Sequence, residues 1–477
     1  MLPTSDEKLR RLTHLFLLTA AVLLAAGCSS TNMGSAGASG AAGPAFVVGT
    51  DAPMASVTSL SVQVQSIDAI NSSGGSVSLL SGTPTVDFAR YNGLQALLDM
   101  NNVPAGTYSS INITLGPGTI GYLDTSGAGA PTIKTEAATF TTSTISVTLA
   151  KPLVVAAGGV PVGLRVDFDL AKSIQVDGGG NITGQVNPTF NVTTVANSDS
   201  SAHIDEYVAA VVSVNASAQS FIVQGPHGEQ FTIDVNGQTE WDGGASLSTL
   251  NSNSIVQVAG QLDKADQTLD ADEVALLSDK GFYASGQVTY VQPSSGAATD
   301  FDLYVRGLLP ASTGVQLGQI AQVNLTGSET FGIYWMHNAF TQFLFNSSGL
   351  VAGQSIAVGG PASGAANASA VTVDRVILRN WGFNGTIVPS SQNSANGTFQ
   401  MKVSGFAGVL IPETITVYLG NSCDFRYGMG AFDDLTSSAS IRVVGLLLKN
   451  PSNGQVILLA RHIDGIDFSD MTTENWH

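Results

Sequence analysis

Between positions 46 and 195, hydrophobic and polar residues alternate along short stretches that are rich in β-branched side chains. Alternation at every second position is typical of strands that bury one face, because successive side chains in a strand point to opposite sides. We therefore expect an all-β domain here, and the number of stretches favours a β-sandwich. The clearest stretches are residues 57–64, 111–115, 145–149 and 164–170.

One segment of this region has a helical rather than an alternating pattern. Leu94, Leu97 and Leu98 share one face of a helix, and Pro104 lies just beyond them. The spacing predicts a short helix over residues 93–100, which would interrupt the strands of the sandwich.

The remainder of the chain contains three copies of one unit. In each copy an apolar residue (Val235, Leu325 or Leu419) is followed six positions later by an aromatic one, and a β-branched strand then ends on a glycine. Shared order with variable loops is what repeated domains show. Each unit offers five or six short strands, and so few strands avoid exposed edges by closing into a small barrel. The aromatic residues are Trp241, Phe331 and Phe425, and the glycines are Gly260, Gly360 and Gly445.

These patterns divide the chain into six segments. The expected order is an export signal and a flexible tether, then a β-sandwich, then three β-barrel repeats. The tether is expected because glycine, serine and alanine dominate it, and such segments behave as flexible coil. The expected boundaries are 1–27 (signal), 28–44 (tether), 45–196 (sandwich), 204–279, 281–380 and 381–468 (barrels).

The N-terminus carries the most specific signal in the sequence. Basic residues precede an apolar run over positions 15–26, which is too short to span a bilayer and ends in small residues before Cys28. This order resembles the bacterial lipobox, which implies that Cys28 is lipidated and becomes the first residue of the mature protein. The usual leucine is displaced by one position, to Leu24. An ordinary cleaved secretory signal with an incidental cysteine is the alternative.

Lipidation predicts a location as well as an anchor. One acyl chain holds a protein only marginally, so stable anchoring needs the several chains that such lipoproteins carry. The resemblance implies an N-acyl chain such as palmitate, and it makes the outer membrane the expected destination because Ser29 and Ser30 stand where aspartate would signal inner-membrane retention.

Two resemblances to known families accompany these patterns. The first domain is similar to domain-of-unknown-function family 4382, which implies a transthyretin- or immunoglobulin-like sandwich. Residues 204–468 resemble domain-of-unknown-function family 5666, which implies small barrel repeats in an exported bacterial protein. Neither family implies an activity. The residues that carry the first resemblance are 48–53, 94–98, 103–108, 166–169 and 187–188.

Charge and cysteine content exclude several classes of function. The net charge of −18 repels phosphate backbones, so we expect no nucleic-acid partner. Cys423 is the only cysteine besides Cys28, so neither a disulfide framework nor a cysteine metal site can form within the mature chain. A small core residue is the favoured interpretation of Cys423, and a reactive thiol or a pairing between chains is the alternative.

Two carboxylate pairs are the remaining candidates for chemistry. Asp167 and Asp169 point to one face of their strand, as do Asp270 and Asp272, and paired carboxylates can bind calcium or act as acid and base. Apolar neighbours pointing inward already explain the alternation, so we favour outward-facing structural aspartates. The glycine spacing of residues 116–121 fits a dinucleotide loop, but Pro117 favours a plain loop and no cofactor.

Four tryptophans are candidate sugar-binding platforms. The repeat gives Trp241 a different role, because a position that accepts either Phe or Trp is more often a core plug. Trp335 is the less constrained candidate, and the remaining two are Trp381 and Trp476.

Together these features predict a lipid-anchored cell-envelope protein. We expect a non-catalytic scaffold, adhesion or ligand-binding role, with an envelope glycan or protein as ligand and an oligomeric state that the sequence leaves open. No cofactor and no metal are expected. The alternative is an envelope polysaccharide-acting enzyme, or its accessory subunit, that uses aspartate carboxylates.

Overall fold

The structure is a computed structural model in which residues 1–40 and 41–477 form two units, and every described element lies in the second unit. No helix in the described part of the chain is long and apolar enough to cross a membrane. The described residues are 42–52, 57–90, 96–124, 130–158, 162–177, 182–195, 203–225, 230–263, 268–310, 313–333, 345–362, 370–404, 410–411, 414–426, 430–435, 440–450 and 452–465.

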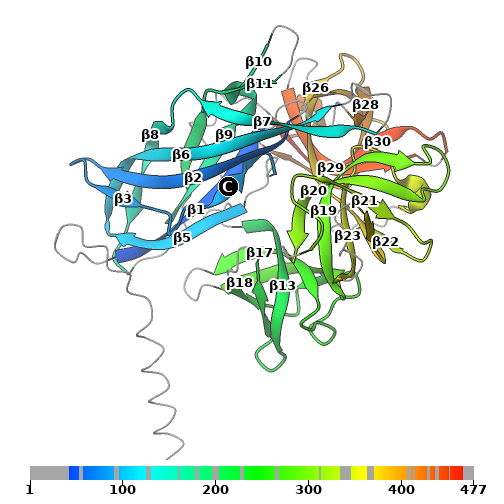
Figure 1. The fold of residues 1–477 in the computed structure, drawn as a ribbon, viewed down its shortest axis with the longest axis horizontal. Helices are drawn as coiled ribbons and strands as arrows, with labels where there is room; N and C mark the ends of the chain where they lie inside the picture. Colours follow the sequence, from blue (N-terminus) through cyan, green and yellow to red (C-terminus); the bar gives the residue numbers. More distant parts are fainter. Residues whose placement is uncertain are drawn as a thin grey trace, which may run out of the picture. The chain divides into compact units, whose positions relative to one another are not determined.

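The first domain is the expected β-sandwich (Figure 1). One sheet has the strand order β12-β9-β1-β5; the other has the order β10-β11-β7-β6-β2-β3, with β4 also paired to β2 and β8 to β6. The elements are β1 (Ala42–Ala52), β2 (Val57–Asn71), β3 (Ser76–Ser78), β4 (Thr85–Asp87), η1 (Phe88–Arg90), β5 (Ala96–Pro104), β6 (Gly106–Asp124), β7 (Thr132–Phe140), β8 (Thr144–Val155), β9 (Val162–Asp169), α2 (Leu170–Ser173), β10 (Ile174–Val176), β11 (Ile182–Val186) and β12 (Phe190–Val195).

Alternation in the sequence accounts for the core of the sandwich. Leu60, Val62 and Val64 of β2 are buried, as every second position of a half-buried strand should be. Three aromatic rings pack together in this core: Phe168 lies edge-on to Phe88 at 5.0 Å between centroids and is stacked on Phe190 at 4.4 Å. Such ring pairs contribute beyond the area they bury.

The helix expected over residues 93–100 is wrong, because positions 96–100 belong to strand β5, while 93–95 lie outside the described residues. The backbone of β5 pairs antiparallel with β1, from Gly49 opposite Ala96 to Ala42 opposite Pro104. A helix over residues 93–100 would have only about two turns, and isolated helices that short are marginally stable in water. The long ladder with β1 therefore decides the conformation.

Strand β1 begins at Ala42, inside the range expected for the tether. Its parallel partner β9 and antiparallel partner β5 enclose it on both edges. Gly43 explains why a tether-like composition can form a strand here: a Cβ at this position would lie 2.1 Å from the carbonyl oxygen of Ala156, so only glycine permits the close approach.

Three consecutive β units follow the sandwich, and we call them the first, second and third barrels. The third is a closed barrel, the first closes on itself through the pairing of β15 with β18, and the second is a seven-stranded sheet with the strand order β22-β25-β23-β19-β20-β21-β24. The first contains β13 (His203–Asn215), β14 (Ser220–Gln224), β15 (Gln230–Asp234), β16 (Glu240–Asp242), β17 (Ile255–Asp263) and β18 (Thr268–Ser278). The second contains β19 (Gly281–Gln292), β20 (Asp300–Leu309), β21 (Ile320–Asn324), β22 (Thr330–Ile333), η3 (Ser347–Gly349), β23 (Ser355–Pro361), β24 (Ala370–Thr372) and β25 (Arg375–Arg379). The third contains β26 (Trp381–Ile387), β27 (Thr398–Ser404), β28 (Thr414–Arg426), η5 (Phe432–Asp434), β29 (Ser440–Lys449) and β30 (Val456–Gly465).

The third barrel shows this connectivity in its simplest form. Its ring order is β26-β27-β28-β30-β29, and only β28 and β30 run parallel. In the first barrel the strand equivalent to β28 is broken into β15 and β16, which both pair parallel with β18. In the second barrel both strands of the parallel pair are broken, so that β21 pairs with β24 and β22 with β25. The three copies inferred from the sequence are therefore three copies in structure.

Two of the recurring glycines lie at bulges between paired strands. At Gly260 the pairing of β17 with β18 shifts by one residue, and a Cβ there would lie 2.0 Å from the carbonyl oxygen of Asp270. Gly445 repeats this arrangement in the third barrel, 2.0 Å from the carbonyl oxygen of Leu459. A small barrel closes through bulges of this kind, which explains the glycine of the first and third repeats. Gly360 of the second repeat differs, because the pairing of β19 with β23 shows no shift there and a Cβ would lie 3.2 Å from the carbonyl oxygen of Thr372.

Candidate functional site

The first aspartate pair is split between two environments. Asp169 is only 8% exposed, and its Oδ1 caps α2 by accepting a hydrogen bond from the backbone N–H of Lys172 at 3.0 Å. Its Oδ2 forms an ion pair with Lys172 Nζ at 2.9 Å. The expectation that both aspartates point outward is therefore wrong for Asp169, because the strand ends there and a helix N-terminus needs a cap.

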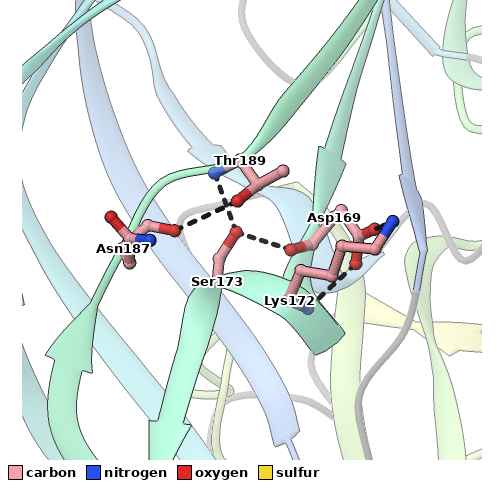
Figure 2. A network of polar contacts seen from close by, with 5 residues as sticks. All are labelled: Asp169, Lys172, Ser173, Asn187 and Thr189. Carbon is pink, nitrogen blue, oxygen red and sulfur yellow. Dashed lines mark hydrogen bonds and ion pairs between the residues drawn. The ribbon is translucent and has the colours of Figure 1, made fainter.

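The cap belongs to a larger polar network that joins two motifs distant in sequence (Figure 2). Ser173 donates its hydroxyl to the carbonyl oxygen of Asp169 at 2.5 Å and accepts from the backbone N–H of Thr189 at 3.0 Å. The backbone N–H of Asn187 donates to the carbonyl oxygen of Ser173 at 2.8 Å. Each contact satisfies a backbone group at a corner of the sandwich, so this network is structural.

Asp167 is the less satisfied member of the pair. Its Oδ1 is buried and accepts no hydrogen bond from the described residues. Burial raises the pKa of this carboxyl to about 6, although the charge of Arg442 in β29 acts in the opposite direction. The nearby charge of Asp169 adds to the increase, whereas Arg165 and Lys172 oppose it.

The second pair, Asp270 and Asp272, is exposed on the outer side of β18, as expected. The strand also places a carboxyl that the alternating pattern does not predict. Ala271 and Val274 both face the core of the first barrel, so the bulge opposite Gly260 leaves Asp272 and Glu273 together on the outer side. Alternation alone would have assigned Glu273 to the core side, and only the recurring glycine signals the shift.

Glu273 lies in a group of three carboxyls. It is directly opposite Glu240 in the parallel ladder of β16 and β18, and it shares a hydrogen bond with Asp242. Burial, with 7% of the residue exposed, raises the pKa of Glu273 to about 9, and the hydrogen bond and charge of Asp242 add to that increase. Glu273 therefore carries a proton at neutral pH. No cluster suited to a metal ion occurs among the described residues.

The repeated aromatic position has the same place in all three barrels. Trp241, Phe331 and Phe425 each lie on the strand that runs parallel to the last strand, opposite the fully buried Val274, Val376 and Ile463. Each ring is half-buried and packs against the core of its own barrel. These contacts agree with the core-plug interpretation for all three residues.

Trp381 is also engaged in an internal contact. The guanidinium carbon of Arg306 lies 5.3 Å from the centroid of the Trp381 ring and 5.1 Å from that of Tyr304. Arg306 is 7% exposed; its Nε donates to Gln287 and its Nη1 donates to the carbonyl oxygen of Ala89 at 3.1 Å. This arginine thus contacts the sandwich, the second barrel and the third barrel.

A second buried arginine joins the first two barrels. Arg379 of β25 forms an ion pair with Glu206 of β13, and its Nη1 donates to the hydroxyl of Tyr283 at 3.0 Å. An apolar cluster that includes Val208 and Leu277 of the first barrel and Ile377 of the second packs beside it. The junction therefore buries both charged and apolar groups.

The other candidates have structural surroundings. Residues 116–121 lie within strand β6, so no helix begins at the glycine spacing. Cys423 is half-buried against the core of the third barrel, which agrees with the core interpretation. Three predicted sites, Cys28, Trp335 and Trp476, lie outside the described residues, as do the signal segment and the tether up to residue 41.

The comparisons with known families agree with these two kinds of domain. Residues 47–188 match DUF4382, a domain of unknown function. Residues 209–275, in the first barrel, match DUF5666, another domain of unknown function. The first resemblance inferred from the sequence is thereby confirmed, and the second is confirmed for the first barrel. No curated protein matches the chain.

Proposed function

We propose that this protein is a lipid-anchored component of a bacterial cell envelope with a non-catalytic scaffold, adhesion or ligand-binding role. The observation that carries the proposal is the N-terminal order of basic residues, a short apolar run and Cys28. That order fits a cleaved signal followed by a lipidated cysteine, because the run is too short to remain in the bilayer as a spanning helix.

Buried contacts between the domains support a scaffold. Arg306 and Arg379 each join separate domains while nearly inaccessible to water. Removing one partner of a buried charge pair costs several kcal/mol, typically about 3–5, so such junctions resist separation. A chain of domains fixed in this way suits a protein that holds a ligand or partner at a set distance from the membrane.

The carboxylates give little support to the enzymatic alternative. Glycosidases need two carboxyl groups roughly 5–9.5 Å apart across a cleft. The carboxylate of Asp169 already caps a helix. Asp242 and Glu273 are hydrogen-bonded to each other, so their carboxyl groups lie closer together than the separation that glycosidases need. We therefore propose an envelope glycan or a protein as the ligand, rather than as a substrate.

Fractionation and capture from intact envelopes test the proposal together. We expect the wild-type chain in the outer-membrane fraction and Cys28→Ser in the soluble fraction. Cross-linking of the anchored form should recover a glycan or a protein that is chemically unchanged, as a bound ligand would be. Turnover of envelope polysaccharide by the purified chain, abolished by Asp167→Asn or Asp242→Asn, would replace this proposal with the enzymatic one.

A further inference from the structure

Strand β16 carries two acidic residues on the outer side of the first barrel. Trp241 packs against the barrel core, so its neighbours Glu240 and Asp242 point the other way. Glu273 on β18 faces the same side and is buried, whereas Glu240 is exposed. Three carboxyls therefore meet on two adjacent strands.

Two hydrogen-bonded carboxyls cannot both be ionised at moderate pH, because like charges so close repel and one group must keep its proton. The charged groups that act on Glu273 are Asp242 and Glu240 on β16 and Arg461 on β30. Burial and the two acids favour the protonated form, and Arg461 alone favours the ionised one. Burial identifies Glu273 as the member that holds the proton, since Asp242 is more exposed.

This pair lies beside the junction between the first and second barrels. Arg375 of β25 donates from Nη1 to the carbonyl oxygen of Gly243, next to Asp242, at 2.9 Å, and to that of Leu276 on β18 at 3.1 Å. Ala275, directly opposite Asp242 in the ladder, is fully buried in the apolar cluster shared by the two barrels. A movement of β16 would therefore disturb the contacts of the junction.

We propose that the proton shared by Asp242 and Glu273 is a pH-sensitive latch that holds β16 against β18 at the junction of the first and second barrels. While the proton is present, the carboxyl pair contributes a hydrogen bond. When the proton is lost to solvent at alkaline pH, two adjacent carboxylates remain with Glu240 beside them. Their repulsion then favours release of β16, and with it the anchor point of Arg375.

Amide hydrogen exchange on the full chain, corrected for intrinsic rates, tests the latch. One proton predicts that the opening equilibrium of β16 rises by up to about tenfold per pH unit as pH increases toward 9. Glu273→Gln keeps a hydrogen-bond donor but cannot ionise, so its profile should be flat. Asp272→Asn, an exposed neighbour on the same strand, is the matched control and should keep the wild-type slope.

Two outcomes would overturn the proposal: a wild-type opening equilibrium that does not change with pH, or a Glu273→Gln profile with the wild-type slope. An NMR titration of isotope-labelled glutamate carboxyls needs no variant, and so does not depend on whether Glu273→Gln folds. One glutamate that titrates near pH 9 supports the latch, whereas titration of every glutamate below pH 6 contradicts it.

Discussion

Arg379 and Glu206 form an ion pair between the second and first barrels, and the arginine is only 8% exposed. This contact changes what the repeat pattern suggests about independence. Repeated domains with separate cores should fold alone, but here the outer sides of β13, β17 and β18 contribute to an apolar cluster shared with the second barrel. An isolated first barrel would expose that surface.

Breaking the Arg379 contact should destabilise the junction. We expect Glu206→Gln to cost less than Arg379→Ala, because the glutamine keeps a hydrogen-bond acceptor for the buried guanidinium. Arg379→Ala removes the buried guanidinium, and with it the ion pair to Glu206, the hydrogen bond to Tyr283 and the packing of the side chain, so the expected loss is about 3 kcal/mol. Denaturant unfolding of the two variants measures both losses; equal, small effects would mean that the ion pair does not hold the junction.

The recurring glycine should be irreplaceable where the strands bend. Gly260→Ala would place a methyl group against a backbone oxygen, and overpacking of this severity costs about 3 kcal/mol. Gly237→Ala, in the same barrel, is the control: no atom lies within 4 Å of the added Cβ, so its effect should stay within about 0.5 kcal/mol. Thermal melts that show the two variants to be alike would contradict the assigned bulge.

Phe331, the aromatic plug of the second barrel, should stabilise the third barrel as well as the second. Phe331 packs edge-on against Phe345 at 5.4 Å, and the core it joins includes Leu446 and Leu459 of the third barrel. Because Phe331 is half-buried, we expect Phe331→Ala to cost about 2–3 kcal/mol, below the range for a fully buried ring. The loss should appear in both barrels.

A surface residue of the same barrel provides the comparison. Leu317 is 55% exposed, so Leu317→Ala should leave the melt unchanged. If Phe331→Ala melts like the wild type but loses affinity for an envelope glycan, the ring is a ligand platform and the plug interpretation fails.

Asp167 should give stability a pH dependence of defined sign. Its pKa is about 6 in the folded chain and near the ordinary 3.8 when unfolded, so the folded state binds more protons between these values. The contribution of Asp167 to the free energy of unfolding is therefore complete below the pKa of the unfolded chain, and it is lost as pH rises through 6. Asp167→Asn should remove that decline, which unfolding free energies of both proteins from pH 4 to 7.5 would show. Parallel curves for the two proteins would contradict the assignment.

Much of the architecture follows from local patterns, because alternation and recurrence report which side of each strand is buried. The sandwich strands, the three barrels and the aromatic positions could be predicted for that reason. The helix over residues 93–100 could not be excluded, since the ladder between β1 and β5 joins distant positions, from Gly49 and Ala96 to Ala42 and Pro104. The buried Glu273 depends on a one-residue bulge, and Arg306 and Arg379 depend on which domains meet. The recurring glycine is the one signal of that bulge, and the two arginine contacts have no local signature.

The central claim concerns Cys28, and the N-terminus of the mature protein tests it most directly. Mass spectrometry of the chain purified from bacterial membranes should find Cys28 as the first residue, with a mass increase that corresponds to a diacylglyceryl group and an N-acyl chain. An unmodified N-terminus at any other position would contradict the lipid anchor, and with it the proposed place of this protein in the envelope.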